Sequence, residues 1–391
     1  MKALGTALQG QDTGAARELY MAMELSDKKW LLVLGDGQRA PSRHTVEAGD
    51  TEGVMRAIAK AKARCGLAEE VRVHSGYEAG RDGFWLHRWL VGQGIDNVVV
   101  DAASIEVNRR ARRAKTDRID GVKLYTMLLR YHGGERKVWA VARVPTAEQE
   151  DARRPLREAE RLQREATAHR NRIGSLLALQ GLRGPTAGGR RWTPWWEQHA
   201  ARLLSEVRAE IEREVERLRL VNAQRKTLED AQREAMAVKP KAAGVQAGEE
   251  AHALARQLCA LGGIGRSSAW LLDKEWLGWR RFRNRREVAA SVGLAGSPYN
   301  SGDSQVEQGI AKAGNKRVRW LLVELAWCWL RYQPDSELTR WFNARFAHGG
   351  KRMRRIGIVA LARRLAIALW RYVDQGVLPA GARLKVAAIA A

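Results

Sequence analysis

The order of β-favouring and helical stretches in the first third of the chain constrains its fold more than any other sequence feature. Residues 19–25 and 30–34 favour strands and are separated by the turn Ser26-Asp27-Lys28-Lys29. A third strand is predicted near residues 43–47, after Gly35-Asp36-Gly37. Short polar turns between such runs are typical of hairpins. The chain is therefore predicted to begin with three antiparallel strands.

The pattern then changes to alternating helices and strands. Helices are predicted over residues 52–65, 84–91 and 115–129, and strands over residues 71–74 and 97–100. Strands joined through a helix pair in parallel, so these strands extend the opening hairpins into one mixed sheet with flanking helices. This order is expected of a ribonuclease-H-like domain.

Acidic residues occur on three elements whose ends can meet in such a sheet. Glu24 is on the first strand, Glu78 follows the fourth strand in Gly76-Tyr77-Glu78-Ala79-Gly80, and Asp117 and Asp120 would share one helix face. Carboxylates of this kind bind hard divalent cations. Plainer explanations remain open: the two aspartates suit a first helical turn after the N-cap Thr116, Glu24 a solvent-facing strand and Glu78 a turn.

Charge points to a polyanionic partner. The 391 residues include 68 Lys and Arg against 44 Asp and Glu, a net charge of +24. Nucleic acid is the expected partner, with an anionic membrane surface as the competitor. A basic run directly before Asp117 suits phosphate groups and consists of Arg109, Arg110, Arg112, Arg113 and Lys115.

Composition also limits the compartment and the metal chemistry. The chain has no apolar run of about 18 residues and no signal-peptide pattern, so we expect neither a membrane span nor export, but a cytoplasmic protein. Cys65, Cys259 and Cys328 form no paired metal-type spacing. We therefore expect reduced thiols and no zinc.

Length and shifts in composition divide the chain into several parts, because 391 residues exceed one ordinary core. The predicted parts are a disordered lead (1–17), an α/β domain (18–145), a helical arm (146–237), a linker (238–250), a mostly helical domain (251–378) and an Ala-rich tail (379–391). The fold class is thus α/β plus α.

The arm is predicted from an apolar stripe with a period near 3.6 residues. The stripe consists of Leu204, Val207, Ile211, Val215, Leu218, Val221 and Leu228. With the helical pattern of residues 146–182, it predicts two long antiparallel helices, separated by a Gly- and Pro-rich break at residues 181–196. A coiled-coil arm that dimerises and a hairpin packed within one chain explain this pattern equally well.

The last domain opens with a helix, a Gly263-Ile264-Gly265 turn and a second helix that begins near Arg266. In a helix-hairpin-helix such a turn presents backbone N–H groups to a DNA phosphate. Glycine at a helix end is also ordinary capping. We interpret the spacing as a phosphate-binding turn.

A polar stretch follows, in which Ser301 precedes a glycine. The cations and amide downstream are Lys312, Asn315, Lys316, Arg317 and Arg319. A serine hydroxyl with nearby cations can attack a phosphodiester, although no histidine suited to act as its base is close in sequence and a turn serine is the plainer explanation. Further on, Arg345, Lys351, Arg352, Arg354 and Arg355 form a basic face, and the tryptophans after Trp320 are explained most simply as core.

Taken in order, these motifs resemble the DEDD transposases of bacterial insertion sequences. The resemblance lies in Met23-Glu24-Leu25-Ser26, Tyr77-Glu78-Ala79-Gly80, Lys115-Thr116-Asp117-Arg118-Ile119-Asp120-Gly121, Gly263-Ile264-Gly265, Val292-Gly293-Leu294, Asn300-Ser301-Gly302 and residues 312–319. It covers nearly the whole chain. It implies a RuvC-like N-terminal domain and a C-terminal domain with a serine nucleophile.

The resemblance also implies roles for individual residues. Glu24, Glu78, Asp117 and Asp120 would bind Mg²⁺ or Mn²⁺, and Ser301 would form a covalent link to DNA. The family usually has Asp at the first position, where this chain has Glu24, with Asp27 or Asp36 as alternatives. Such enzymes act on element ends and target DNA, work as homo-oligomers with sites shared between subunits, and use a structured guide RNA.

The resulting hypothesis is a nucleoid-associated bacterial recombinase that cuts and rejoins DNA by serine transesterification. A RuvC-like junction-resolving nuclease would use the same acids with water as the nucleophile. A nucleic-acid-binding protein whose catalysis has lapsed is the third possibility, since Glu24 departs from the family pattern.

Overall fold

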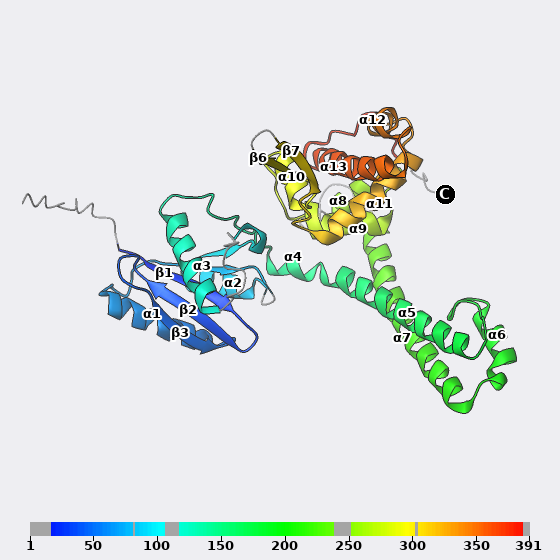
Figure 1. Ribbon diagram of the computed structural model, residues 1–391, viewed down its shortest axis with the longest axis horizontal. Helices are drawn as coiled ribbons and strands as arrows, with labels where there is room; N and C mark the ends of the chain where they lie inside the picture. The colour runs from blue at the N-terminus through cyan, green and yellow to red at the C-terminus, as the bar shows by residue number, and fades with distance from the viewer. Residues whose placement is uncertain (1–16, 81–82, 106–116, 238–251, 302–303, 386–391) are drawn as a thin grey trace, which may run out of the picture. The chain divides into compact units, whose positions relative to one another are not determined.

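The computed structural model describes residues 17–80, 83–105, 117–237, 252–301 and 304–385 (Figure 1). The chain divides into two compact units, residues 1–145 and 146–391. The predicted lead up to residue 16, the basic run from Arg109 to Lys115 and the predicted linker lie outside the described residues. Among the described helices, none is both long and apolar enough to cross a bilayer.

The N-terminal unit is built on one five-stranded sheet with the order β3-β2-β1-β4-β5. β1 pairs antiparallel with β2, and β2 with β3, whereas β4 joins β1 and β5 joins β4 in parallel. The predicted mixed sheet is confirmed. The strands are β1 (Leu19–Leu25), β2 (Lys29–Gly35), β3 (Ser42–Glu47), β4 (Val73–Glu78) and β5 (Asp96–Val100).

The fourth strand differs from its prediction. It runs from Val73 to Glu78, so Glu78 ends the strand and does not lie in a following turn. Gly76 is inside β4. A Cβ there would lie 3.3 Å from both Leu128 Cδ1 and Val98 Cγ2. The glycine therefore serves close packing of a helix on the sheet.

Helices cover both faces of this sheet. α1 (Thr51–Cys65) and α2 (Trp85–Gly92) pack on the face that carries Met21 and Met23. α3 (Asp117–His132) packs on the opposite face, where Leu124 and Leu128 contact Ala22 and Val100. A short 3-10 turn, η1 (Ala102–Ser104), follows β5.

Local signals set the ends of α1. The carboxylate of Asp50 accepts a hydrogen bond from the Gly53 N–H (2.7 Å), and Gly66 ends the helix with φ +63°. Val54, Ile58 and Ala61 form its buried face. Both caps are local sequence features, which explains why the predicted helix agrees with the structure.

The second unit begins with the helical arm. Its helices are α4 (Ala147–Asp151), α5 (Arg154–Leu179), α6 (Trp192–His199), η3 (Ala200–Arg202) and α7 (Ser205–Ala237). The ion pairs Arg172–Glu210 and His169–Glu214 show that α5 and α7 run antiparallel. Leu218 and Ile211 are buried against α5, so the apolar stripe packs within the chain. α6 begins in the predicted break and extends past its end at residue 196.

The rest of this unit is mostly helical, as predicted. Its elements are α8 (Ala253–Cys259), α9 (Arg266–Leu272), the π-helical turn η5 (Asp273–Leu277), α10 (Arg285–Ser291), β6 (Gly296–Ser301), β7 (Ser304–Ile310), α11 (Lys316–Tyr332), α12 (Glu337–Phe346) and α13 (Lys351–Gln375). Trp276, Trp329 and Leu365 are buried in its core. The β6–β7 hairpin was not predicted, because its residues lack the apolar alternation of a half-buried strand.

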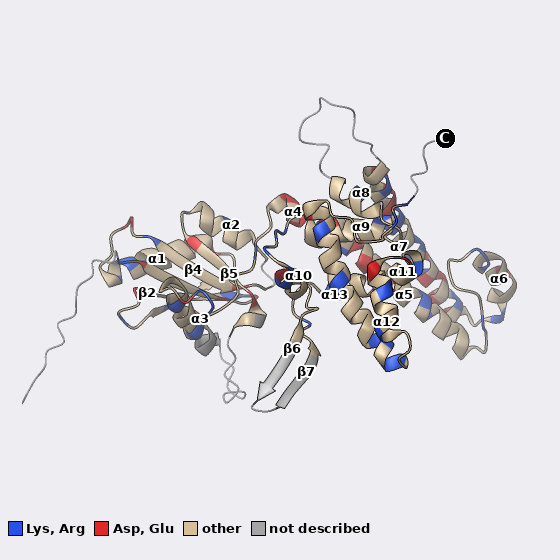
Figure 2. Cartoon of the chain, turned by 90° about the horizontal axis from the view of Figure 1, so that it is seen from above, with Lys and Arg blue, Asp and Glu red and all other residues tan. Residues whose placement is uncertain are grey.

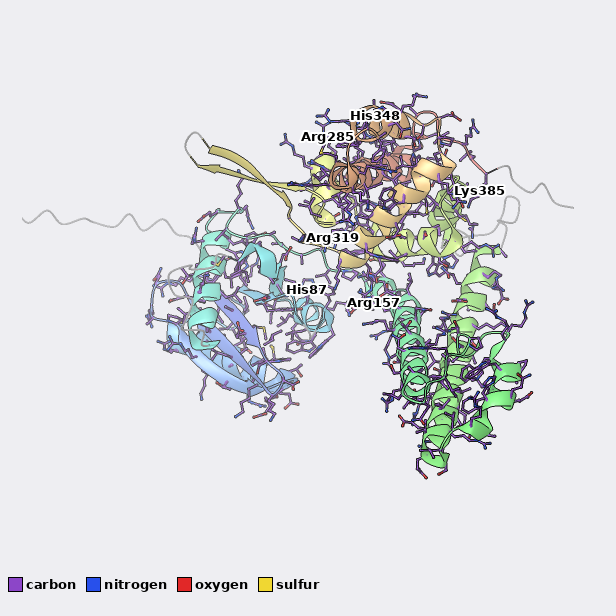
Figure 3. The ribbon with its side chains drawn as sticks, turned by 45° about the vertical axis from the view of Figure 1, so that its right-hand side comes forward. His87, Arg157, Arg285, Arg319, His348 and Lys385 are labelled. Atoms are coloured by element: carbon purple, nitrogen blue, oxygen red, sulfur yellow. The ribbon has the colours of Figure 1, made fainter. Side chains whose placement is uncertain are left out.

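A buried carboxylate anchors the root of the arm. Glu275, 1% exposed, accepts hydrogen bonds from Arg157 Nε (2.8 Å) and Nη2 (3.2 Å) on α5. Nearby, Arg317 Nε donates to Glu160 Oε2 (2.6 Å). Burial raises the pKa of Glu275, but the Arg157 guanidinium and neighbouring cations outweigh it, so that its pKa is below the ordinary value. Figure 3 labels Arg157 beside the C-terminal helices.

Candidate functional site

Two of the predicted acids lie on neighbouring strands at one end of the sheet. The parallel register pairs Met23 with Tyr77, which places Glu24 and Glu78, the next residues, at the same level. Side chains alternate along a strand, and Ala22 and Gly76 face α3. Glu24 and Glu78 are therefore on the α3 face, Glu24 half-buried and Glu78 exposed.

The first turn of α3 lies over the same end of the sheet. α3 begins at Asp117 and includes Asp120. A Cβ on the next residue, Gly121, would lie 3.3 Å from Leu31 Cδ2. Leu31 is the register partner of Glu24 in β2. The backbone thus brings three elements together at one end, and we call Glu24, Glu78 and the first turn of α3 the acid corner.

The two alternatives to Glu24 differ in position. Asp27 lies in the turn between β1 and β2, next to the acid corner. Asp36 follows β2 at the opposite end of the sheet, where Gly35 pairs with Tyr20. Its pKa is lowered: burial raises it, but the N–H groups of Arg39 and Gln38, which donate to its carboxylate, prevail. Asp36 cannot replace Glu24 at the acid corner.

Ser301 is the last residue of β6 and pairs with Ser304 of β7. The sequence indicates only a polar stretch here, whereas the structure places Ser301 at the end of a strand in a two-stranded hairpin. The hairpin starts at Gly296 and ends at Ile310, and its base borders a groove.

This groove, about 1600 Å³ in volume, lies between α10, α12, α13 and the base of the hairpin. Its apolar lining includes Trp341, Val359 and Ile367, and the Arg364 guanidinium lies 4.0 Å from the Trp341 ring centroid. Among the described residues that line it, Glu337 is the only acidic one. We call it the basic groove, after its nine cationic lining residues: Arg285, Arg286, Lys312, Lys351, Arg352, Arg355, Arg363, Arg364 and Arg371.

The basic groove was foreseen only in part. The sequence predicts a basic face that includes Lys351, Arg352 and Arg355, and Figure 2 shows Lys and Arg along α12 and α13. Arg363 and Arg371 continue that face along the uninterrupted helix α13, a signal that helical spacing could have given. Arg285 and Arg286 come from α10, which only the tertiary fold places beside α13.

The predicted phosphate-binding turn connects α8 and α9. Gly263 has φ +88°, and a Cβ there would lie 3.3 Å from Tyr332 Cβ. Gly265 caps α9 and faces open space, and Arg266 is exposed. The carbonyls of Cys259 and Ile264 accept hydrogen bonds from Lys385 Nζ (2.6 and 2.7 Å; Figure 3). Residues 383–385, expected in the tail, therefore pack on this turn.

The predicted cluster at residues 312–319 is divided between two roles. Lys312 and Lys316 are exposed. Asn315 caps α11 by accepting from the N–H groups of Arg317 and Val318 (3.0 and 3.2 Å). The Arg317 side chain pairs with Glu160, and Arg319 Nη1 donates to the carbonyls of Val292 and Ala313 (3.1 and 3.3 Å). The side chains of Asn315, Arg317 and Arg319 thus have partners within the protein.

Comparison with known proteins identifies the class. Residues 255–339 match the family model described as "Transposase IS116/IS110/IS902 family". The chain is 42% identical over 387 residues to "Putative transposase y4rJ" of Sinorhizobium fredii, covering 96% of each chain. It is 31% identical over 125 residues to "Transposase for insertion sequence element IS1328" of Yersinia enterocolitica, covering 31% of this chain and 36% of that one.

The class of protein is thus that of the transposases, enzymes that cleave and rejoin DNA. The chain belongs to the IS116/IS110/IS902 family, since the first of these relatives matches it over nearly its full length. DNA is accordingly its substrate and partner.

Proposed function

We propose that this transposase cuts and rejoins DNA through a covalent phosphoserine intermediate formed by Ser301. The observation that carries the proposal is the acid corner, where three elements far apart in sequence meet. The N-terminal unit supports assignment to the RNase H-like, RuvC-like class through its strand order, with three antiparallel strands followed by two parallel ones.

The donor set at the acid corner fits Mg²⁺ or Mn²⁺. All four side chain types are carboxylates, which supply the hard oxygen ligands that these ions prefer. Glu24 and Glu78 share a face and a level of the sheet, and Asp117 and Asp120 are in the adjoining first turn of α3. A bound ion would offset charge on the phosphate and on the leaving oxygen.

The chain's own part in the reaction is nucleophilic. Ser301 Oγ forms a bond to phosphorus, and the bond from phosphorus to one deoxyribose oxygen breaks. The proton lost by the serine is balanced by one gained at the leaving oxygen. One phosphodiester is exchanged for another, so the linkage retains the energy that rejoining requires. Hydrolysis would lose it.

Binding surfaces for the DNA follow from the second unit. We infer that the basic groove holds phosphates, because its cations converge over an apolar floor at the base of the hairpin whose first strand ends at Ser301. The turn at Gly263 and Gly265 would act as a helix-hairpin-helix, with Arg266 beside the phosphate. The basic run from Arg109 to Lys115 would add further contacts.

We infer three functional parts in the chain: a nuclease domain (18–145), an arm (146–237) and a transposase domain (251–378). We also infer that the active enzyme binds a guide RNA and forms a homo-oligomer in which α5 and α7 contribute contacts between subunits.

The test is an adduct assay with Mg²⁺, DNA of the element end and the RNA encoded beside it. Wild-type protein is expected to form a protease-sensitive protein–DNA adduct, which Ser301→Ala abolishes. Ser304→Ala is the matched control, because it removes the same hydroxyl from the paired residue of the hairpin. Adduct formation by Ser301→Ala would overturn the assignment.

Two further outcomes separate the rival functions. Strand cleavage that persists in Ser301→Ala and leaves no adduct would identify a junction-resolving nuclease that uses water. Salt-sensitive DNA binding without any metal-dependent cleavage by the wild type would identify a binding protein whose catalysis has lapsed.

A further inference from the structure

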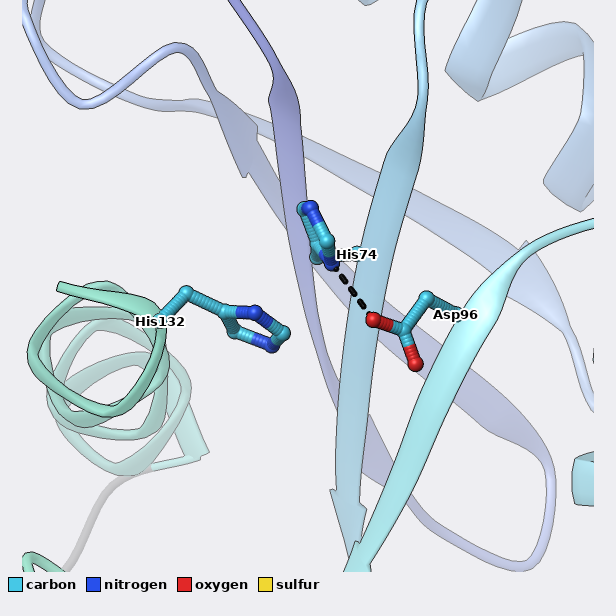
Figure 4. Close-up of side chains that lie close together, drawn as sticks. All are labelled: His74, Asp96 and His132. Atoms are coloured by element: carbon cyan, nitrogen blue, oxygen red, sulfur yellow. Dashed lines mark hydrogen bonds and ion pairs between the residues drawn. The ribbon is translucent and has the colours of Figure 1, made fainter. Parts of the chain in front are cut away.

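The end of the sheet opposite the acid corner carries a second cluster of metal-ligating side chains, His74, Asp96 and His132 (Figure 4). One ligand atom from each lies within 4.8 Å of the others. His74 and Asp96 are register partners on β4 and β5, and His132 is the last residue of α3. Since α3 has 16 residues, about 24 Å separates this cluster from the acid corner.

The cluster is held in place by its surroundings. His74, 4% exposed, has Nδ1 2.9 Å from Asp96 Oδ2. On its other side, His74 Nε2 lies 3.0 Å from Glu18 Oε2, without the alignment of a hydrogen bond. The Tyr20 ring stacks on the His74 ring at 5.3 Å, and the His132 ring centroid is 4.0 Å from that of His74.

The Nε2 atom of His132 is buried and has no hydrogen-bond partner among the described residues. Buried polar atoms are normally satisfied, and one that is not usually marks a site completed by something else. Here it lies beside a second imidazole and a carboxylate. Asp96 is exposed, which leaves a path from solvent.

We propose that His74, Asp96 and His132 bind a zinc-class divalent cation. Two imidazole nitrogens and one carboxylate oxygen form a ligand set typical of Zn²⁺, whereas Mg²⁺ prefers oxygen alone. Bonds of about 2.0–2.1 Å in a tetrahedral site place ligand atoms about 3.3 Å apart. The observed spread within 4.8 Å therefore requires only small side-chain adjustments.

Metal binding also gives Glu18 a role. The cation would replace the proton between His74 Nδ1 and Asp96, and His74 Nε2–H would then donate to Glu18. A carboxylate that accepts from the far nitrogen of a ligating imidazole is the usual outer partner at such sites. The bound ion would tie β4, β5 and the end of α3 together, far from the reacting phosphate.

Sequence spacing does not reveal this site, because its ligands are 22 and 36 residues apart and none is a cysteine. The expectation of no zinc rested on cysteine spacing alone. None of the three ligands belongs to the acid corner, so zinc binding here is independent of the proposed chemistry.

Tag-free full-length protein, cleared with chelator, should be titrated with Zn²⁺ and with Co²⁺ in excess Mg²⁺. We expect one equivalent of Zn²⁺ and a visible Co²⁺ spectrum of a four-coordinate site. Asp96→Asn keeps an acceptor for His74 Nδ1 but removes the charged ligand, and His132→Gln removes the partly exposed imidazole. Each should weaken Zn²⁺ binding by more than the roughly 10–100-fold expected when an outer partner is lost, and Glu18→Gln by about that range.

Controls make the outcome decisive. His44→Gln removes an imidazole from β3 of the same unit, and Asp120→Asn alters the acid corner; both should leave the Zn²⁺ equivalent and the Co²⁺ spectrum unchanged. Circular dichroism identifies any variant that fails to fold. Wild-type protein that binds no Zn²⁺, or binding that survives in both Asp96→Asn and His132→Gln, would overturn the proposal.

Discussion

The arginines of the second unit serve two different purposes. At the arm root, Arg157 binds a carboxylate that is 1% exposed, and Arg317 binds Glu160 across the same joint. In the basic groove, nine cations are accompanied by one acidic residue, Glu337, among the lining residues that the structure describes. The arginines at the arm root are thus paired with carboxylates of the same chain. The cations of the basic groove outnumber the acidic residue beside them, so the groove carries a net positive charge.

This difference shows that a net charge of +24 is a poor guide to which cations bind DNA. A guanidinium with a buried carboxylate partner contributes to folding, and its removal leaves an uncompensated charge. A cation in an acid-poor groove can pair with a phosphate, and counterions are released when it does so. The two groups should therefore respond differently to substitution, to salt and to pH.

The largest effect is expected in the basic groove. Replacing Arg352, Arg355 and Arg363 with Ala should weaken DNA binding by about 100-fold and lower the slope of log K against log salt by about 3, because each phosphate contact contributes about 0.9. Fluorescence anisotropy across a salt series measures both. The control replaces three exposed cations of the other unit, Arg43, Lys60 and Lys137. Equal losses in both triple variants would show that only total charge matters.

Substitution at the arm root is expected to lower the stability of the protein and to leave its DNA binding unchanged. Glu275→Gln leaves the Arg157 guanidinium without its charged partner and should lower the free energy of unfolding by about 2 kcal/mol, since Arg157 is 44% exposed and partly hydrated. Urea denaturation provides the measurement. The double variant Arg157→Met/Glu275→Leu should recover part of the loss. A reduced salt slope of DNA binding in Glu275→Gln would contradict the division into two groups.

The same carboxylate predicts a pH dependence. The pKa of Glu275 is below its ordinary value near 4.5 in the folded protein. Its stabilising contribution is therefore fully present above about pH 4.5 and is lost as pH falls through the lower folded pKa. The stability difference between wild type and Glu275→Gln should shrink below that pH. A difference that grows on acidification would reverse the assigned sign.

The smallest effect is expected on the surface of the arm. Arg172 pairs with Glu210 between α5 and α7, but its side chain is 52% exposed. Arg172→Ala should change the free energy of unfolding by less than about 1 kcal/mol, because solvent and salt screen such pairs. A loss as large as that of Glu275→Gln would show that exposure does not separate the two kinds of ion pair.

Much of the fold could be predicted from local signals. The caps of α1 at Asp50 and Gly66 are local, and the hairpin turns between the first strands are too. The β6–β7 hairpin could not be predicted, since its strands are defined by pairing with each other and not by an apolar face. The extension of β4 to Glu78 could not be predicted for a related reason. Glycine is typical of turns, but in the structure Gly76 is inside the strand, where the absence of a Cβ lets Leu128 pack closely.

The order of the elements, the excess of positive charge and the candidate acids Glu24, Glu78, Asp117 and Asp120 follow from the amino-acid sequence, because periodicity, capping and charge are properties of residues and their near neighbours. Which side chains meet depends on the three-dimensional fold. It set Glu24 beside Glu78 through strand register and enclosed Glu275 with Arg157. It also gathered His74, Asp96 and His132 at one end of the sheet. Register and helix docking join residues distant in sequence, and no local pattern encodes such distances.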